Sequence, residues 1–346
     1  MNLQSYDDVV SYLEKKRRSK HLLLGNGFSM AYDPNIFSYT ALNKFIDELD
    51  DELLRKLFEI INTKNFEIVM QQLDNFVEIA KAFSSDNTLI QKIKKANTTL
   101  KQSLINAVKS LHPEHVFKIP DSNSSACAKF LSKYLQSEGN VFTTNYDILL
   151  YWVLMRNTVS NSIDGFGRYA EETGEYIPED DLEYSELTWG KHKEKQNIHY
   201  LHGALPLFDT GIEIVKEEYD GQHFLLENIN KRVEQKEYPI FITAGDGQQK
   251  LAHIMHNKYL TFCYEKLSSI EGSLISFGFN FGEYDDHIIE AINVAAKHGK
   301  PSGNKLFSIY IGVYSDAGKK HIESIKSKFK CKVNLYDTKT ANVWGL

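Results

Sequence analysis

Two apolar runs far apart in the chain end abruptly at small and polar residues. The first covers His21–Gly25 and continues as Asn26–Ser29, and the second covers Asn140–Thr144 and continues as Asn145–Asp147. A buried parallel strand has this pattern when the loop at its carboxyl end faces a polar ligand. We therefore predict two strands whose ends meet the same ligand.

The first of these loops is rich in glycine. Gly25 and Gly27 let the backbone turn tightly and approach a phosphate closely. The residues after them are expected to open a helix whose free N–H groups face that anion. Glycine pairs are common after apolar runs, so this loop alone is weak evidence for a phosphate site. The polar residues at other strand ends strengthen it.

Short apolar runs recur along the chain and alternate with segments of helical periodicity. We expect further strands at Asn197–Leu201, Tyr238–Thr243, Ser273–Phe277, Leu306–Val313 and Val333–Tyr336. We expect helices at residues 3–20, 124–136, Lys258–Ser269 and Asp286–Lys297. This alternation predicts an α/β fold with a doubly wound, mostly parallel sheet.

Two segments interrupt the alternation. Residues 41–118 have helical periodicity with almost no glycine or proline, and we interpret them as a large helical insertion that caps the sheet. Residues 153–196 are polar and rich in Glu and Tyr, which is typical of an excursion from the core. No repeat or low-complexity linker divides the chain, so residues 1–346 are expected to form a single domain.

Composition limits the partners and the compartment. The formal net charge of −6 argues against nucleic-acid binding, which requires clustered Lys and Arg. No apolar run reaches the roughly 20 residues that span a bilayer, and the first residues do not read as a signal peptide. The three cysteines are widely spaced, so we expect reduced thiols in a cytoplasmic protein that does not bind membranes.

Four loops follow expected strands and carry polar residues or glycine: Gly25–Ser29, Thr144–Asp147, His202–Gly203 and Gly278–Asp285. A dinucleotide is the simplest ligand that would meet all four along one edge of a sheet. The common dinucleotide fingerprint is not met, because Met30 stands where its third glycine belongs and no acidic residue ends a second strand about 20 residues later. This weakens the interpretation as a dehydrogenase.

The order of four strings resembles the sirtuin superfamily. They are Gly25-Asn-Gly-Phe-Ser29, Thr143-Thr-Asn-Tyr-Asp147, Leu201-His-Gly203 and Ser276-Phe-Gly278. Residues 276–288, Ser-Phe-Gly-Phe-Asn-Phe-Gly-Glu-Tyr-Asp-Asp-His-Ile, look like the pattern of bacterial SIR2-like proteins of antiviral defence. The resemblance spans roughly residues 20–315 and implies a Rossmann-like sheet with NAD as its ligand.

One departure bears on the reaction. Protein-deacylating sirtuins carry a four-cysteine zinc module, and this chain has no cysteine pair to build one. The resemblance therefore favours the branch that hydrolyses NAD⁺ to nicotinamide and ADP-ribose, with no metal. Nicotinamide in NAD⁺ is already a cation, so it leaves as a neutral amide without the strong general acid that ordinary glycosides need. Stabilisation of an oxocarbenium-like centre and exclusion of bulk solvent are the main requirements.

The resemblance also implies roles for individual residues. Asn145 would hold a water or a ribose hydroxyl, and a neutral His202 would accept a proton from the water or that hydroxyl. Asp147 would orient groups on the nicotinamide side or offset positive charge. The residues expected to bind NAD are Gly25, Asn26, Gly27, Phe28, Ser29, Thr144, Asp147, Gly203, Ser276, Gly278 and Asp285.

Several of these residues also have structural explanations. Asn145 and Asp147 are good helix N-caps, and His202 would be an ordinary half-buried histidine if seen in isolation. The residues Asp285, Asp286 and His287 look like the start of a helix with favourable first-turn carboxylates. The pairs His112/His115 and His253/His256 lack a third ligand and are expected to be surface or packing residues.

By family analogy the activity would deplete NAD⁺ in antiphage defence, and it would be controlled by assembly as a homo-oligomer or by a partner such as a ring-forming ATPase or a sensor protein. A protein that binds NAD or ADP-ribose without turnover is the alternative from another class. Protein deacylation and ADP-ribosyl transfer are further alternatives.

Overall fold

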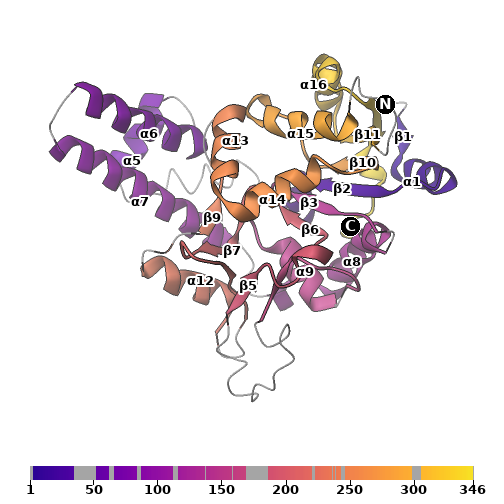
Figure 1. The fold of residues 1–346 in the computed structure, drawn as a ribbon, viewed down its shortest axis with the longest axis horizontal. Coiled ribbons are helices and arrows are strands. Elements are labelled where there is room, and N and C mark those ends of the chain that lie inside the picture. Colours follow the sequence, from indigo (N-terminus) through magenta and orange to yellow (C-terminus); the bar gives the residue numbers. More distant parts are fainter. Residues whose placement is uncertain are drawn as a thin grey trace.

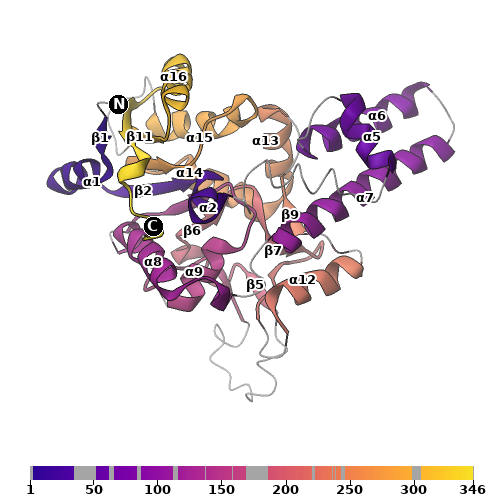
Figure 2. The same ribbon diagram turned by 180° about the vertical axis from the view of Figure 1, so that it is seen from behind.

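The computed structural model describes residues 3–34, 52–61, 66–83, 87–111, 116–136, 138–157, 159–168, 186–219, 223–235, 237, 239–242, 246–297 and 305–345. Figures 1 and 2 show a central sheet with helices on both faces and a helical group that extends away from it. No helix in these described ranges is long and apolar enough to cross a membrane.

The central sheet has seven strands, and every neighbouring pair is parallel. Its strand order is β1 (Gln4–Ser5), β12 (Lys332–Asp337), β11 (Leu306–Val313), β10 (Gly272–Phe277), β2 (Lys20–Leu24), β3 (Val141–Thr143) and β6 (Ile198–Tyr200). The predicted α/β, Rossmann-like fold with a parallel sheet is thereby confirmed.

The strand order reverses at one point. Without the two-residue edge strand β1, the strands from β6 to β12 follow one another in the chain order 3-2-1-4-5-6, with β2 as the first. This is the order of dinucleotide-binding sheets, in which ligands bind beyond the carboxyl ends of the strands where the order reverses. In this sheet the reversal lies between β2 and β10.

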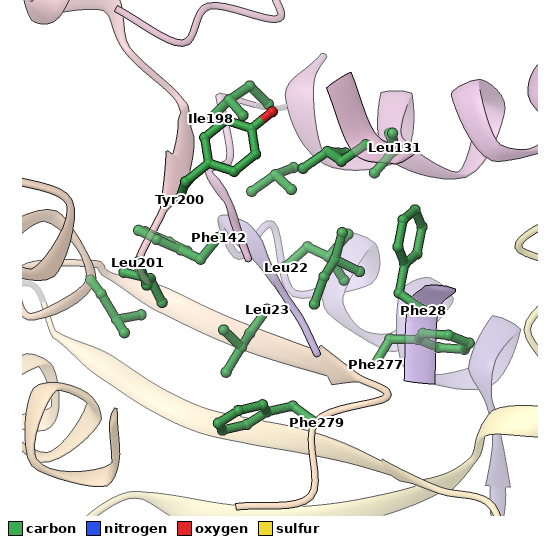
Figure 3. Close-up of a cluster of buried hydrophobic side chains, with 14 of the residues drawn as sticks. Leu22, Leu23, Phe28, Leu131, Phe142, Ile198, Tyr200, Leu201, Phe277 and Phe279 are labelled. Carbon is green, nitrogen blue, oxygen red and sulfur yellow. The ribbon is translucent and has the colours of Figure 1, made fainter. Parts of the chain in front are cut away.

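The sheet is buried on both faces, as its apolar runs require. All five residues of β2 and all six of β10 are buried. Figure 3 shows Leu22 and Leu23 of β2, Phe142 of β3 and Phe277 of β10 in one continuous apolar cluster. The core therefore fixes the strands whose ends carry the candidate site.

Helices of the core connect the strands, and three of them lie close to the helices predicted at 124–136, Lys258–Ser269 and Asp286–Lys297. The core helices are α1 (Tyr6–Lys15), α2 (Gly27–Tyr32), α8 (Asp121–Leu135), α9 (Leu149–Asn157), α13 (Gly247–His256), α14 (Lys258–Leu267), α15 (Asp286–Ala296) and α16 (Asp316–Ile325). Short 3₁₀ turns lie at Val116–Lys118 (η1), Lys193–Lys195 (η2), Glu283–Asp285 (η3), Lys326–Lys328 (η4) and Thr338–Thr340 (η5).

The expected helix at residues 3–20 is shorter than predicted. Gln4–Ser5 pair with β12, and Ser5 then caps α1 by accepting the Asp8 N–H while the Asp8 carboxylate accepts the Ser5 N–H. This reciprocal cap starts the helix at Tyr6. The edge pairing was missed because two residues are too short to show an alternating pattern.

A second, antiparallel sheet was not predicted. Its order is β4 (Phe166–Gly167), β5 (Leu187–Trp189), β8 (Ile214–Lys216), β7 (Gly203–Asp209) and β9 (Pro239–Phe241), and α12 (Leu225–Glu234) follows β8. The strand expected at Tyr238–Thr243 is β9, so placing it in the parallel series was wrong. The apolar residues of β9 fit either sheet, and its antiparallel pairing with β7 places it in the second sheet. The predicted excursion 153–196 starts too early, because residues 153–157 belong to α9 and Val153 lies in the core, and its later described part contributes β4 and β5.

The helical insertion contains α5 (Glu52–Ile61), α6 (Phe66–Phe83) and α7 (Asn87–Leu111). Its buried residues form an apolar cluster separate from the core of the sheet, with Phe58, Val69 and Leu100 among its members. Figures 1 and 2 show these helices beside α13 and β9 and not over the face of the sheet. The helical character is confirmed, whereas the single-domain organisation stays a prediction.

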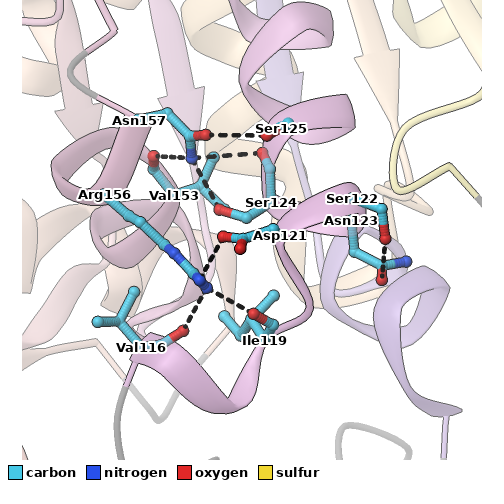
Figure 4. A network of polar contacts seen from close by, with 10 residues as sticks. All are labelled: Val116, Ile119, Asp121, Ser122, Asn123, Ser124, Ser125, Val153, Arg156 and Asn157. Atoms are coloured by element: carbon cyan, nitrogen blue, oxygen red, sulfur yellow. Dashed lines mark hydrogen bonds and ion pairs between the residues drawn. The ribbon is translucent and has the colours of Figure 1, made fainter.

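A polar network joins α9 to the start of α8. The Arg156 guanidinium donates to the carbonyls of Val116 (3.0 Å) and Ile119 (2.5 Å) and pairs with Asp121 (Figure 4). The Asn157 amide donates to the Ser124 hydroxyl at 2.7 Å. These contacts fix the helix that follows the Asn145–Asp147 loop.

Candidate functional site

The four predicted loops follow four strands that are neighbours in the sheet. Phe277 of β10 pairs with Leu24 of β2, Leu24 pairs with Thr143 of β3, and Thr143 pairs with Tyr200 of β6. Because these partners stand at the same level, the next residues of all four strands emerge along one edge. The structure thus brings the four strings to a common edge, as the sequence predicted.

Glycines allow the loops after β2 and β10 to touch at the reversal point. The Gly25 N–H donates to the Phe277 carbonyl at 3.0 Å, and the Gly27 N–H donates to the Gly278 carbonyl at 2.8 Å. A Cβ on Gly27 would lie 2.5 Å from the Gly278 Cα, and Gly278 itself has a positive φ of 70°. No other residue fits there. The predicted phosphate contact of these glycines stays a prediction.

The rest of the first loop divides between surface and core. Asn26 precedes α2 and makes no side-chain cap. Phe28 is buried, its ring lies 5.0 Å from that of Trp344, and the Trp344 indole N–H donates to the Phe28 carbonyl. The Phe28 side chain therefore serves the core, and ligand binding by this residue through its ring is not supported.

Side chains from the two opening strings meet in a hydrogen-bonded cluster. The Asn145 amide donates to the Ser29 hydroxyl at 2.9 Å, and the Ser29 hydroxyl donates to the Asp147 carboxylate. All three residues are buried. Since a serine hydroxyl can both accept and donate, this arrangement fixes the direction of both bonds and the orientation of the Asn145 amide.

Asp147 also caps the next helix. Its other carboxylate oxygen accepts the Leu149 N–H at the start of α9 at 3.0 Å. Burial raises the pKa of this carboxyl, while the bonds from Ser29 and the Leu149 N–H act in the opposite direction. The capping explanation therefore holds for Asp147. It does not hold for Asn145, whose side chain bonds Ser29.

His202 follows β6 and pairs with a second histidine. Its Nε2 lies 2.8 Å from the Nε2 of His287, which stands in the first turn of α15, and the two rings stack with centroids 5.1 Å apart. Burial lowers the pKa of His202 well below its ordinary value, helped by His287 and Lys250. His202 is therefore neutral near pH 7, as the proposed role requires, although one of its ring nitrogens is already engaged.

A buried cation stands beside this pair. Lys250 of α13 is 4% exposed, and its ammonium lies 3.5 Å from the Asp285 carboxylate. Asp285 was predicted as a ligand residue or helix cap, and its side chain makes no cap to α15. Burial raises the pKa of this carboxyl, and Lys250 opposes the shift.

His287 and Lys250 were not among the predicted site residues. His287 lies on the apolar face of its helix beside Ile288 and Ala291, where a polar residue is a detectable signal. Lys250 gave no such signal, because only the packing of α13 brings it inward. Asp286 is the first residue of α15, as predicted for a first-turn carboxylate, and it also forms an ion pair with Lys328 at 2.7 Å.

The remaining predicted residues lie on the same edge. Gly203 has a φ of 80°, and a Cβ there would be 1.9 Å from the Ile240 carbonyl of β9, so the second sheet requires glycine. The Thr144 N–H is donated to the Leu24 carbonyl at 3.0 Å. Ser276, near the end of β10, is buried, and its hydroxyl has no hydrogen-bond partner among the described residues.

The histidine pairs with a spacing that could suit a metal do not form a metal site in the described part of the chain. No group of three or more His, Cys, Asp or Glu side chains with metal-binding geometry occurs there. His253 and His256 are exposed on α13, as expected for surface residues. His112 and His115 lie outside the described residues.

A polar pocket of about 280 Å³ lies at the other edge of the sheet, beside the amino ends of β2, β3 and β10. Its lining includes His21, Asn140, Lys266 and Glu271. None of the predicted site residues lines it. The pocket is therefore separate from the candidate site, which lies where the same strands end.

The profile of a family described as a domain of unknown function, DUF4917, matches residues 22–344 of the chain. None of the curated proteins compared with the sequence matches it.

Proposed function

The chain belongs to the DUF4917 family, and we propose that it is a NAD⁺ glycohydrolase that cleaves the bond between nicotinamide and ribose. The observation that carries the proposal is the convergence of Ser29, Asn145 and Asp147 beside the reversal point of a sheet with dinucleotide-binding strand order. The resemblance of the four loops to SIR2-like proteins of antiviral defence supports it further.

In this proposal Asn145 is the residue that orients the reacting group. Its amide nitrogen is fixed by the Ser29 hydroxyl, which leaves the amide oxygen to hold a water or a ribose hydroxyl. A side chain held in this way loses little entropy when the substrate binds, because it is already ordered. Ser29 and Asp147 act through Asn145 and keep it in place.

His202 is the proposed proton acceptor. It follows the strand next to the one that Asn145 follows, and each residue stands two positions beyond the Thr143–Tyr200 pair. The buried ring is neutral and can take the proton of the attacking water or of a ribose hydroxyl. The nicotinamide departs as a neutral amide, so no general acid has to act on the other side of the bond.

The test is release of nicotinamide and ADP-ribose from NAD⁺, followed by chromatography for the wild type and for Asn145→Ala. We expect turnover by the wild type once it is in its active assembly, and a loss of about 1,000-fold in Asn145→Ala. Thr98→Ala is a matched control, because this exposed helical residue bonds only a carbonyl within α7. Equal activity of wild type and Asn145→Ala would remove the proposal.

One observation favours the alternative, a protein that binds NAD or ADP-ribose without turnover. Both proposed catalytic side chains are bonded within the protein, Asn145 to Ser29 and His202 to His287. Calorimetry distinguishes the two functions. Binding of NAD⁺ with no product in any assembly state would favour the sensor.

We further propose that the protein acts as a homo-oligomer or with a protein partner. Large apolar side chains are exposed on the insertion, notably Leu53 and Ile60 of α5 and Phe76, Ile79 and Phe83 of α6. The three on α6 are spaced so that they share one side of the helix. Light scattering across a concentration series, with and without NAD⁺, tests assembly, and a monomer under every condition would contradict it.

A further inference from the structure

Two buried histidines face each other at the carboxyl edge of the sheet, and their hydrogen bonding is incomplete. The Nε2 atoms of His202 and His287 are 2.8 Å apart. Only one of them can carry a proton in such a contact, because the other has to accept it. The His287 Nδ1 is buried and has no hydrogen-bond partner among the described residues.

Burial and the charges around the pair keep both rings neutral. Burial and, to a smaller extent, the Lys250 ammonium lower the pKa of His287 to about 3, while Asp286 acts in the opposite direction. His202 responds to burial, His287 and Lys250 in the same direction. Lys250 is itself held by Asp285. The pair is therefore two neutral imidazoles that share one proton, and not an imidazole with an imidazolium.

We propose that His287 is a positioning residue, and this proposal rests on the proposed function. His287 accepts the Nε2–H of His202, so that the Nδ1 of His202 is unprotonated and available to the substrate. The contact between the two Nε2 atoms supports this assignment. Because Nε2 of His202 is occupied by His287, Nδ1 is the ring nitrogen that remains for chemistry. In serine-protease triads a carboxylate fixes the histidine tautomer in this way, and here a neutral imidazole does so.

With Nδ1 unprotonated, His202 can take a proton from the attacking water. An O–H bond of water breaks as its proton forms a bond with Nδ1 of His202, and the water oxygen bonds to C1′ of the ribose. The C1′–N bond breaks, and its electron pair neutralises the pyridinium nitrogen of the departing nicotinamide. His202 is then an imidazolium, whose Nε2–H is still donated to His287, and it returns its extra proton to solvent. The net products are nicotinamide, ADP-ribose and a proton.

The assignment places the proton of His287 on its Nδ1. A buried donor without a partner destabilises the fold, so packing has to hold the ring in place. His287 is fully buried, and the Tyr264 hydroxyl donates to its backbone carbonyl at 3.0 Å. An unfavourable group held by its surroundings is typical of functional sites.

The first test reads the tautomer directly and needs no turnover. Long-range ¹⁵N–¹H spectra of the full chain labelled in histidine would show His202 with a protonated Nε2 and a bare Nδ1. His21 and His199 are internal references with Nε2–H fixed by Glu271 and Asn140. In His287→Leu the His202 signals should move toward a mixture of tautomers while both references stay unchanged. A His202 protonated at Nδ1 in the wild type overturns the proposal.

The second test uses kinetics of two variants. His287→Leu removes the acceptor and should lower kcat about 100-fold with KM changed less than about threefold. His287→Gln restores an acceptor oxygen and should return kcat to within about tenfold of the wild type. Equal kcat for the Leu and Gln variants would overturn the positioning role. If the wild type itself does not hydrolyse NAD⁺, the proposed function fails, and the spectra still decide whether His287 sets the tautomer.

Discussion

The two edges of the parallel sheet each hold a pair of buried histidines, and the pairs are bonded differently. His21 lies near the amino end of β2, and His199, the middle residue of β6, bonds through its ring to Asn140 just before β3. His202 lies beyond the carboxyl end of β6 and pairs with His287. Burial lowers the pKa of all four rings. The direction of the pKa shift therefore does not distinguish a structural histidine from a functional one, and the completeness of hydrogen bonding has to do so.

At the amino edge every ring nitrogen has a partner. The His21 Nε2–H is donated to the Glu271 carbonyl at 2.9 Å, and its Nδ1 accepts the Asn140 N–H at 3.0 Å. The Asn140 side-chain oxygen accepts the Nε2–H of His199, whose Nδ1 faces the Gln196 amide at 3.3 Å. Since each donor meets an acceptor, this network ties three strands together and leaves no nitrogen for a ligand.

At the carboxyl edge the bonding is unfinished. The His287 Nδ1 and the Ser276 hydroxyl are both buried and both lack a partner among the described residues. Most buried polar groups in folded proteins are bonded, so two such groups at one edge indicate a place where a ligand or water completes the structure. The comparison thus supports the proposal that the amino edge of the sheet serves folding and its carboxyl edge serves chemistry.

The largest expected effect separates the two edges by activity. His202→Ala should lower NAD⁺ hydrolysis about 1,000-fold, because it removes the proposed proton acceptor. His199→Ala, three residues earlier in the same segment, should keep activity per folded molecule within about threefold. Both variants are assayed for nicotinamide release, with the folded fraction measured by circular dichroism. Equal losses in the two variants would break the comparison.

The next expected effect is on stability, and here the substitution at the amino edge should have the larger effect. His199→Leu leaves the Asn140 oxygen without the Nε2–H donor and takes one acceptor from the Gln196 amide, so it should lower the free energy of unfolding by about 3 kcal/mol. His287→Leu leaves the His202 Nε2–H without its acceptor but also removes the unpartnered Nδ1, so its cost should be smaller, about 1 kcal/mol. Urea unfolding at pH 8 measures both values. A larger loss for His287→Leu would contradict the proposed division.

The pH dependence of stability should be alike at the two edges. The pKa values of His21, His199 and His287 are lowered to about 4, 3 and 3, so the folded protein stays unprotonated where the unfolded chain, with values near 6.5, takes up protons. The contribution of these three neutral histidines to folding stability is fully present above about pH 6.5. It is lost as the pH falls toward their pKa values in the folded protein. Each contributes about 1.4 kcal/mol per pH unit, hence about 2 kcal/mol by pH 5.

This dependence is measured by urea unfolding between pH 8 and pH 5. His21→Gln and His287→Leu should each reduce the loss of stability across this range by the share of one histidine. A wild-type protein whose stability is flat over this range would show that these rings are protonated in the folded state. It would also remove the neutral pair on which the His287 proposal depends.

Particular residues show how far the sequence could predict the structure. The apolar runs at 21–25, 140–144 and 273–277 placed three strands within a residue or two of their observed ends, because parallel strands buried on both faces are apolar throughout. That placement brought Ser29, Asn145 and Asp147 to one edge. The antiparallel sheet was missed because Pro239–Phe241 is apolar in either sheet, and only the contact between Gly203 and β9 reveals its partner.

The site was predicted where strands supply it and missed where helices do. Asn145 and His202 follow strand ends, so their position is readable from a local pattern. Lys250 and His287 come from α13 and α15, whose packing against each other depends on distant contacts. Gly247 shows this, since a Cβ there would lie 3.2 Å from the backbone nitrogen of His287. No local pattern in the chain encodes that approach.

The smallest expected effect uses two serines of one strand. Ser273 of β10 is hydrogen-bonded to Ser308 at 3.0 Å, whereas Ser276, three residues nearer the carboxyl end, has no partner in the part of the chain that the structure describes. Ser273→Ala should lower the free energy of unfolding by about 1 kcal/mol, and Ser276→Ala should leave it unchanged or raise it by a few tenths, since no bond is lost. NAD⁺ should stabilise the wild type against thermal unfolding more than it stabilises Ser276→Ala, because the ligand supplies the missing partner. If Ser276→Ala is instead the more destabilised apo protein, its hydroxyl is already satisfied, and the contrast between the two edges rests on the histidines alone.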